Sequence, residues 1–424
     1  MKRLAPAFVL LALLLTGLLL ATLTRTTPLT YRWLHADMLS ALTLILLAAH
    51  GLVAWANDES DLWPTVITAC LFSAAAVLDH VGLRSGLLLL GSSLLALRTG
   101  TRLPLVAALS TGVGLVSLAV VSGAWLLDAP GAGAGLNSLS FALLLTGTLT
   151  ASGVHGAVRG RMPTGTPLVA VLCLTTLLRL FSLGPWNLGW LFAALVVGGA
   201  TVLMAAWHAA AAPPKQVGAW LGLYLTGLAV AGAGLGSGAG VTLAGYALLT
   251  WPVVQLGLAR PGGPAWTRWL FTGAVPLSAP FVAAWLAVAA AVASGLSLVA
   301  VAFWGAALLV AVATSRLAVP VALAANPAPP SRQSTAAILS LVLGLGSPLV
   351  VLGLLEPLAA QLQGGLTPFG ELALWPWAGL IALNAARQPV ATLPSLALTA
   401  LMLLLTALGW VLMRLNGLRG TRNG

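Results

Sequence analysis

Ionisable side chains are scarce in this sequence, so those that lie beside or within apolar segments are the first candidates for chemistry. The 424 residues include only 19 Lys or Arg, 8 Asp or Glu and 5 His. Three of these side chains are candidates for a proton path: His155, Arg179 and Lys215. Histidine titrates near physiological pH, and the pKa of a buried lysine shifts readily with its surroundings. Side chains of these types could therefore pass protons across a membrane.

Each candidate also has a structural interpretation. His155 lies beside a predicted helix break and could be a neutral histidine bonded to a backbone carbonyl. Arg179 lies near the end of an apolar run and could extend its charge to the membrane interface. Lys215 could anchor a loop at the start of a helix. The pair Asp79 and His80 could bind a cation or accept a proton, or it could cap a helix and contact water.

The composition decides which fold has to position these groups. Hydrophobic residues make up 59% of the chain and charged residues 6%, whereas a soluble domain has about 25% charged residues. Apolar segments long enough to cross a bilayer follow one another with short loops. They predict an all-α, multi-pass protein of the cell inner (plasma) membrane with about 13 to 15 transmembrane helices. The net charge of +11 comes from Lys and Arg between apolar runs, as in loop anchors, so we expect no nucleic acid partner.

The predicted spans follow from the apolar runs, and two of them should be interrupted helices. Breaks are expected near Gly147–His155 and at Pro276–Phe281, and helices of this kind often line polar cavities in transporters. Two further spans are expected at 372–383 and 396–413. The other spans are expected at about 5–23, 38–56, 63–78, 83–97, 103–127, 139–158, 167–183, 188–210, 217–231, 241–258, twice within 273–320, and at 336–355.

Cofactor ligands are not apparent in the sequence. Cys70 and Cys173 lie within apolar runs and have neither metal-ligand spacing nor a disulfide pattern. We find no haem or iron–sulfur ligand pattern, no nucleotide loop and no Ser-His-Asp arrangement. We therefore expect no cofactor, and any redox reaction would belong to partner subunits.

Six short segments, in order along the chain, match motifs of one protein family. Residues 35–40 resemble its D-x-L-S, residues 87–95 its F-L-G-x-E-L, and residues 215–220 with Gly227 its K-R-L-L-A-Y…G. Residues 245–248 resemble A-Y-A-L, residues 278–281 resemble T-A-G-F, and residues 315–317 resemble Y-L-R. Over about 37–320 the chain thus resembles the antiporter-like membrane subunits of respiratory complex I, in particular chain N of bacterial NADH-quinone oxidoreductase.

The departures from this family concern its charged positions. The family's glutamate corresponds to Ser93, the lysine of its first broken helix to the stretch ending at Thr150, and the lysine that follows G-F to Ala284. In the family, lysines whose charge is modulated by carboxylates are thought to move protons. Ser, Thr and Ala cannot change charge in this way. The resemblance therefore implies the antiporter-like fold with degenerate or lost proton translocation.

These observations predict a single transmembrane domain, with an antiporter-like core at about 37–320 and additional C-terminal helices at 334–424. The first functional hypothesis is a membrane-arm subunit of a complex I-like assembly, with other membrane subunits and the lipid bilayer as partners and with quinone reached through those subunits. The alternatives are a stand-alone secondary transporter and an inactive membrane scaffold for a partner subunit. The few charged residues make this chain at most a non-catalytic subunit.

Overall fold

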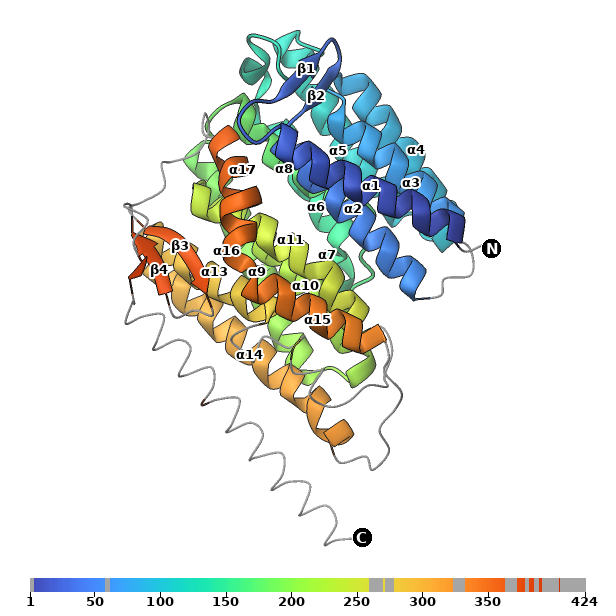
Figure 1. Ribbon diagram of the computed structural model, residues 1–424. Coiled ribbons are helices and arrows are strands. Elements are labelled where there is room, and N and C mark those ends of the chain that lie inside the picture. The colour runs from blue at the N-terminus through green and yellow to red at the C-terminus, as the bar shows by residue number, and fades with distance from the viewer. Residues whose placement is uncertain are drawn as a thin grey trace, which may run out of the picture. The chain divides into compact units, whose positions relative to one another are not determined.

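The computed structural model describes residues 4–57, 62–258, 270, 278–322, 332–362, 372–377, 381–384, 389–390 and 404 (Figure 1). The chain forms two compact units. Unit 1 comprises Met1–Val196, Gly236–Val241 and Leu352–Pro368, and unit 2 comprises Val197–Leu235, Thr242–Val351 and Phe369–Gly424.

Unit 1 is built around one fully enclosed helix, α8. Each residue of α8 from Leu168 to Phe181 is buried, and α8 packs against α2, α3, α4, α5 and α6. An apolar helix could face lipid, but a helix with an arginine inside it, such as Arg179 of α8, turns that side chain toward protein. The helices of unit 1 are α1 Leu4–Leu23, α2 Met38–Ala56, α3 Trp63–Val77, α4 Val81–Thr99, α5 Leu103–Ser122, α6 Ser138–Ser152, α7 Val154–Val158 and α8 Pro167–Leu183, with a 3₁₀ turn, η1, at Ala132–Gly135.

A short β-hairpin connects α1 to α2 at one end of unit 1 (Figure 1). Strands β1 (Leu29–Tyr31) and β2 (Leu34–Ala36) are antiparallel, with Tyr31 opposite Leu34. Arg32 in the tight turn has a positive φ of 52°. The sequence predicted only a polar link here. Because β2 ends at Ala36 and α2 begins at Met38, the hairpin holds His35, within β2, close to Asp37, the single residue between the two elements.

The first predicted helix break is confirmed at Gly153. Helix α6 ends at Ser152, Gly153 has a φ of 89°, and α7 begins at Val154. A Cβ atom at Gly153 would lie 2.8 Å from the backbone nitrogen of Gly165. Both the left-handed conformation and the close backbone approach favour glycine at this position.

The second predicted break, at Pro276–Phe281, lies partly outside the described residues. Helix α13 begins at Ala279 with Pro280 in its first turn, where proline costs no backbone hydrogen bond. The run at 336–355 was predicted to be a span, and the structure forms it as a bent helix pair that together is long and apolar enough to count as one span. Helix α15 ends at Leu345, and the chain bends at Gly346. Pro348 follows, which has no backbone N–H to continue the helix.

Beyond Gly346 the chain forms three short segments in succession. They are α16 (Ser347–Val350), a π-helical turn η2 (Val351–Leu355) and α17 (Glu356–Gln361). A π-helical turn is rare and is frequently found at functional sites. The final segment, α17, belongs to unit 1.

Unit 2 has an apolar helix, α13 (Ala279–Ala293), that packs against α10, α14 and α15. Its other long helices are α10 Pro214–Gly234, α14 Ser297–Ala322 and α15 Arg332–Leu345, while α9 (Leu188–Ala211) and α11 (Gly238–Leu258) each have one end in unit 1. The predicted span at 372–383 is wrong: β3 (Leu372–Trp377), β4 (Ile381–Asn384) and β5 (Pro389–Val390) form an antiparallel sheet. The run is too short to cross a bilayer as a helix, and Pro376 and two tryptophans disfavour one.

The helices confirm a multi-pass membrane protein. Among the described residues, eight helices are long and apolar enough to cross a membrane, or up to nine if the bent pair at Gly346 is one span. Four shorter apolar helices accompany them, including α3 and α8. The number of membrane-crossing helices comes close to the predicted 13 to 15 only if the four shorter helices also cross the membrane. The predicted run at 396–413 lies outside the described residues, except for residue 404.

Candidate functional site: a buried ionic cluster in unit 1

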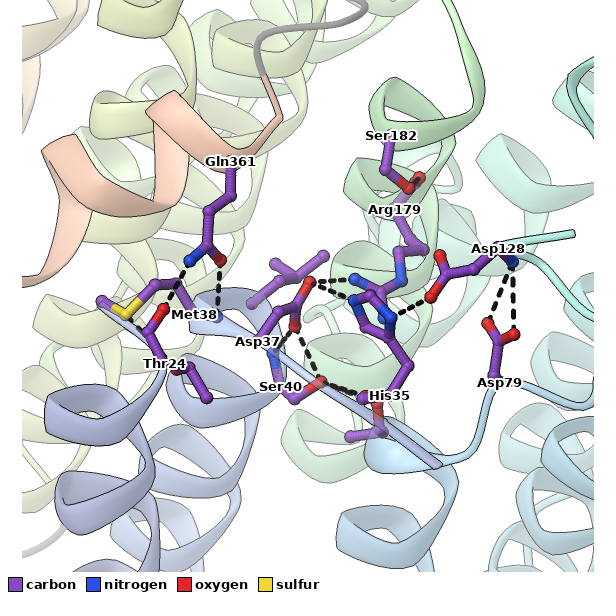
Figure 2. A network of polar contacts seen from close by, with 12 residues as sticks. Thr24, His35, Asp37, Met38, Ser40, Asp79, Asp128, Arg179, Ser182 and Gln361 are labelled. Atoms are coloured by element: carbon purple, nitrogen blue, oxygen red, sulfur yellow. Dashed lines mark hydrogen bonds and ion pairs between the residues drawn. The ribbon is translucent and has the colours of Figure 1, made fainter. Parts of the chain in front are cut away.

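The cluster is built on the start of α2, where Asp37 caps the helix (Figure 2). The Asp37 carboxylate accepts hydrogen bonds of 2.8 Å from both the backbone N–H and the hydroxyl of Ser40. The Ser40 hydroxyl also lies 3.0 Å from the carbonyl oxygen of Ala76 on α3. A carboxylate at this position satisfies backbone N–H groups and suits the positive end of the helix dipole. Asp37 is nevertheless buried, so its charge needs a counter-charge.

Arg179 on the central helix α8 supplies that counter-charge. Its guanidinium forms an ion pair with the Asp37 carboxylate, and both residues are buried (Figure 2). The expectation that Arg179 reaches the membrane interface is therefore wrong. The physical reason is that helices enclose α8 on all sides, and Asp37 neutralises the arginine inside the unit.

His35, at the end of the hairpin, lies between two carboxylates. Its Nε2 atom is 3.5 Å from a carboxylate oxygen of Asp37, and its Nδ1 atom contacts the carboxylate of Asp128. Asp128 is partly exposed and lies in the connection between α5 and α6. When His35 is protonated, it links Asp37 and Asp128 into one charged chain that runs from the buried Arg179 to a more accessible carboxylate.

Asp79 and His80 have different roles: His80 caps a helix, and Asp79 makes buried contacts. His80 caps α4, because its Nδ1 atom accepts hydrogen bonds from the backbone N–H groups of Gly82 and Leu83. The Asp79 carboxylate is buried instead of hydrated, and both of its oxygens accept from the backbone N–H of Asp128 at 3.2 Å. The capping interpretation is thus confirmed for His80, while the water contact expected of Asp79 is wrong.

The two buried carboxylates have opposite pKa shifts. Burial alone would raise the pKa of Asp37, but Arg179 and the hydrogen bonds from His35 and Ser40 outweigh burial and lower it. Burial raises the pKa of Asp79, and the positive charges of Arg179, His35 and Arg84 only partly oppose this effect. When two neighbouring acids have different pKa values, the one with the lower pKa stays charged and the one with the higher pKa accepts a proton. Within this cluster Asp37 is the permanent charge, and Asp79 is the carboxylate that takes up a proton more readily.

A second buried arginine, Arg84, approaches the cluster from α4. Its Nη2 atom donates a hydrogen bond of 3.2 Å to the hydroxyl of Thr176 on α8. Thr176 precedes Arg179 by three residues, so the two lie on the same face of α8 one turn apart. We define the ionic cluster as His35, Asp37, Asp79, Arg84, Asp128 and Arg179.

Of the three predicted proton-path residues, the structure places only Arg179 in this cluster. His155 lies on α7, and its buried Nδ1 atom has no hydrogen-bond partner among the described residues. Lys215 is exposed at the start of α10 in unit 2.

The three positions predicted to have lost a charge lie within helices. Ser93 is half-buried on α4 and donates its hydroxyl to the carbonyl oxygen of Leu89 at 2.8 Å. Thr150 is half-buried on α6, and Ala284 is 5% exposed on α13. None of these side chains can ionise. That they occupy positions where related subunits have charged residues stays a prediction from the sequence.

Sequence reasoning missed His35, Arg84 and Asp128 as site residues. One available signal was Arg84, because an arginine at the start of an apolar helix needs either water or a charged or polar partner. A second signal was the spacing of His35 and Asp37, which are separated by one residue and lie just before a helix. Asp128 gave no signal, since it lies in a Gly-rich connection whose course depends on packing.

Comparisons with known proteins agree on the fold. No known family model matches the sequence, and no curated protein matches it. Solved structures do match with probability 1.00. A chain of the Mrp complex from Dietzia sp. DQ12-45-1b has a TM-score of 0.67 at 16% identity, covering 84% of this chain and 92% of that one. A chain of respiratory complex I from Thermus thermophilus has a TM-score of 0.64 at 16% identity, covering 84% and 95%.

A third match is a chain of the membrane-bound sulfane sulfur reductase, an archaeal respiratory membrane complex. Its TM-score is 0.66 at 15% identity, and the match covers 96% of this chain and 81% of that chain. All three solved structures are of complexes. The chain therefore has the antiporter-like fold of membrane subunits in these complexes, as the sequence resemblance implied.

Proposed function

We propose that this chain is a membrane-arm subunit of a complex I-like assembly, either an NADH-quinone oxidoreductase or a related complex. The observation that carries the proposal is the extent of the structural match. It covers 84% of this chain and more than nine-tenths of the matched chains of the Mrp complex and complex I. A chain that keeps the whole fold of such a subunit is best explained as a subunit of the same kind. Its partners are then other membrane subunits, and any quinone chemistry belongs to those partners.

Proton translocation by the lysine and glutamate pathway of the related subunits is, in our proposal, degenerate or lost here. Ser93, Thr150 and Ala284 occupy the positions that the sequence resemblance assigns to charged side chains. A neutral side chain cannot take up a proton and release it when a neighbouring charge changes. In the part of the chain that the structure describes, the buried charged side chains belong to the ionic cluster at one end of unit 1, where α2 and α4 begin.

The contacts of the ionic cluster favour a role in holding that end together. Asp37 joins α2 to α8 through Arg179, and Asp79 joins the hairpin to the α5–α6 connection through backbone hydrogen bonds with Trp33 and Leu127. At the same end, the Gln361 side chain of α17 donates to the Thr24 carbonyl and accepts from the Met38 N–H. The cluster therefore stabilises the unit whether or not protons cross it.

Two other functions stay open as alternatives, a stand-alone secondary transporter and an inactive scaffold that recruits a partner subunit. Purification of the tagged full-length chain from its native membrane in mild detergent separates the first alternative from the proposal. We expect several other membrane proteins to co-purify in fixed ratio. A chain that elutes alone as a monomer from the native membrane would overturn the proposed assembly and favour the transporter.

The lost proton pathway is tested separately, in vesicles that contain the purified chain and a trapped pH-sensitive dye. We expect an imposed membrane potential to drive no proton uptake above that of protein-free vesicles. Vesicles with an added proton ionophore provide the positive control for dye response. Uptake that depends on the chain would contradict the loss of translocation while leaving the proposed assembly untouched.

A further inference from the structure

The buried guanidinium of Arg84 has fewer partners than its charge and its donors require. Arg84 is 3% exposed, and among the described residues it has one hydrogen bond, to the neutral hydroxyl of Thr176. Its Nε and Nη1 atoms are buried and have no acceptor among the described residues. No carboxylate of the described residues lies within ion-pair distance of it. A buried positive charge without a counter-charge is among the most costly arrangements in a protein.

Arg179 presents the same kind of deficit close by. One of its terminal nitrogens pairs with Asp37, but its Nε and Nη2 atoms are buried without an acceptor among the described residues. Arg84 contacts Thr176, one turn from Arg179 on the same face of α8, so the two guanidinium groups belong to one neighbourhood. The buried hydroxyl of Ser85, next to Arg84, is also without a partner among the described residues.

The acidic side chains of the cluster do not make up this deficit. Asp37 is occupied by Arg179 and Ser40, and Asp128 by His35. Asp79 accepts two hydrogen bonds from the Asp128 backbone, and burial raises its pKa, so its negative charge is the least secure of the three. None of these carboxylates contacts Arg84, so an acceptor with its own negative charge would complete the contacts of its guanidinium.

We propose that Arg84, with Arg179 beside it, binds a small monovalent inorganic anion such as chloride or nitrate in the interior of unit 1. Such an anion would accept from the unpartnered N–H groups of Arg84 and Arg179, and its negative charge would lie in direct contact with the Arg84 guanidinium. Water alone would satisfy the donors but would leave the charge of Arg84 uncompensated. A planar guanidinium with five donors suits both a spherical halide and a planar oxyanion. The site does not depend on the proposed assembly.

Thermal unfolding of the purified full-length chain tests this site. The protein is prepared with gluconate, which is too large for an enclosed site, as the only anion, and chloride or nitrate is exchanged for it at constant ionic strength. Tryptophan fluorescence reports unfolding, since the chain has 16 tryptophans. Because a ligand that binds only the folded state stabilises it by mass action, we expect the melting temperature to rise with chloride or nitrate and then to level off.

Substitutions assign the effect to the site. In Arg84→Gln the anion-dependent rise in melting temperature should disappear. Arg98 is an exposed arginine on the same helix, and in Arg98→Gln the rise should be unchanged. If Arg84→Gln does not fold, Thr176→Val removes only the hydrogen bond that positions Arg84 and should raise the half-saturating anion concentration about tenfold, which corresponds to about 1.4 kcal/mol. Radioactive chloride should bind the wild-type chain at about one ion per chain. No bound chloride, or an unchanged rise in the substituted chains, would overturn the proposal.

Discussion

The helices α8 of unit 1 and α13 of unit 2 are both enclosed by their neighbours, yet only α8 carries charge. α8 is buried continuously from Leu168 to Phe181, a run that includes Arg179. The buried positions of α13, including Ala284, are all apolar. Among the described residues, the buried charged side chains Asp37, Asp79, Arg84 and Arg179 all belong to unit 1.

This difference shows what keeps a charge inside a membrane fold. In unit 1 the charges lie where helices begin or end, so that backbone N–H groups, hydroxyls and opposite charges all reach them. Ala284 lies inside α13, whose backbone groups are already paired, and an isolated charge there would have little to interact with. A change of charge should therefore have different consequences in the two units.

The largest effect should follow from removing the counter-charge in unit 1. Arg179→Met would leave the Asp37 carboxylate buried without its partner, and we expect a loss of about 3–5 kcal/mol in the free energy of unfolding. Chemical unfolding in detergent, followed by tryptophan fluorescence, measures the change. The double substitution Asp37→Asn/Arg179→Met should recover part of the loss, while Arg98→Met should have little effect. A single Arg179→Met chain as stable as wild type would mean that the ion pair is dispensable.

The next effect should come from introducing charge into unit 2. Ala284→Lys places an ammonium group inside α13 and should cost about 3 kcal/mol. Ala284→Met, with a neutral side chain of similar length, reports the steric part alone. We expect Ala284→Lys to be clearly less stable than Ala284→Met, in the same unfolding assay. Equal stability of the two would show that unit 2 still contains groups able to accept a charge at this position.

The double substitution Ser93→Glu/Ala284→Lys tests whether proton translocation can be restored by returning two of the missing charges. If only those two charges are missing, the double variant should show proton uptake in vesicles, and Ser93→Gln/Ala284→Met should not. No uptake by the double variant would indicate that the pathway is closed for further reasons, as the neutral stretch ending at Thr150 already suggests.

The two units differ in buried charge, but we expect them to be equally sensitive to overpacking between helices. A Cβ atom at Gly147 of α6 would lie 2.2 Å from the Thr111 hydroxyl, and one at Gly198 of α9 would lie 2.4 Å from the backbone nitrogen of Ala231. Alanine at either glycine should cost about 1–3 kcal/mol through overpacking. Gly86→Ala is the control, because no atom lies within 4 Å of its added Cβ. If only one of the two substitutions is costly, the units differ in packing as well as in charge.

Local sequence signals predicted most helices of both units but not the ionic cluster. The predicted bounds of α2 and α8 agree with the structure because Asp37 and Pro167 are strong signals for a helix start. The hairpin was missed because three-residue strands have too few positions for a period to appear. The break after α15 was visible in Gly346 and Pro348 but was outweighed by the length of the apolar run.

The ionic cluster was beyond local reasoning because its contacts are long-range. Arg179 and Asp37 are 142 residues apart in the sequence, and their pairing depends on how α8 packs against α2. No spacing rule relates two such residues. The sequence predicted that Arg179 would reach the membrane interface, and only packing could show that it is buried and that Asp37 is its partner.

The smallest effect should be a change in the pH dependence of stability, and it distinguishes the two carboxylates of the cluster. The folded pKa of Asp37 is lowered, so its stabilising contribution is present above the ordinary carboxyl pKa and is lost as the pH falls through the folded value. The folded pKa of Asp79 is raised, so the folded state holds that proton more tightly than the unfolded state. Between the ordinary pKa of Asp79 and its raised value, the stability contributed by Asp79 therefore decreases as the pH rises.

Asp79→Asn should remove this decrease, because the amide stays neutral at every pH while it can still accept from the Asp128 backbone N–H. The free energy of unfolding, measured by denaturant titration at a series of pH values, should then fall less steeply above the ordinary carboxyl pKa than in wild type. Asp37→Asn should instead lose stability throughout the range above that pKa, since Arg179 loses its counter-charge. If the two asparagine variants had parallel pH profiles, the carboxylates would share one environment, and the division between permanent charge and proton acceptor would not exist.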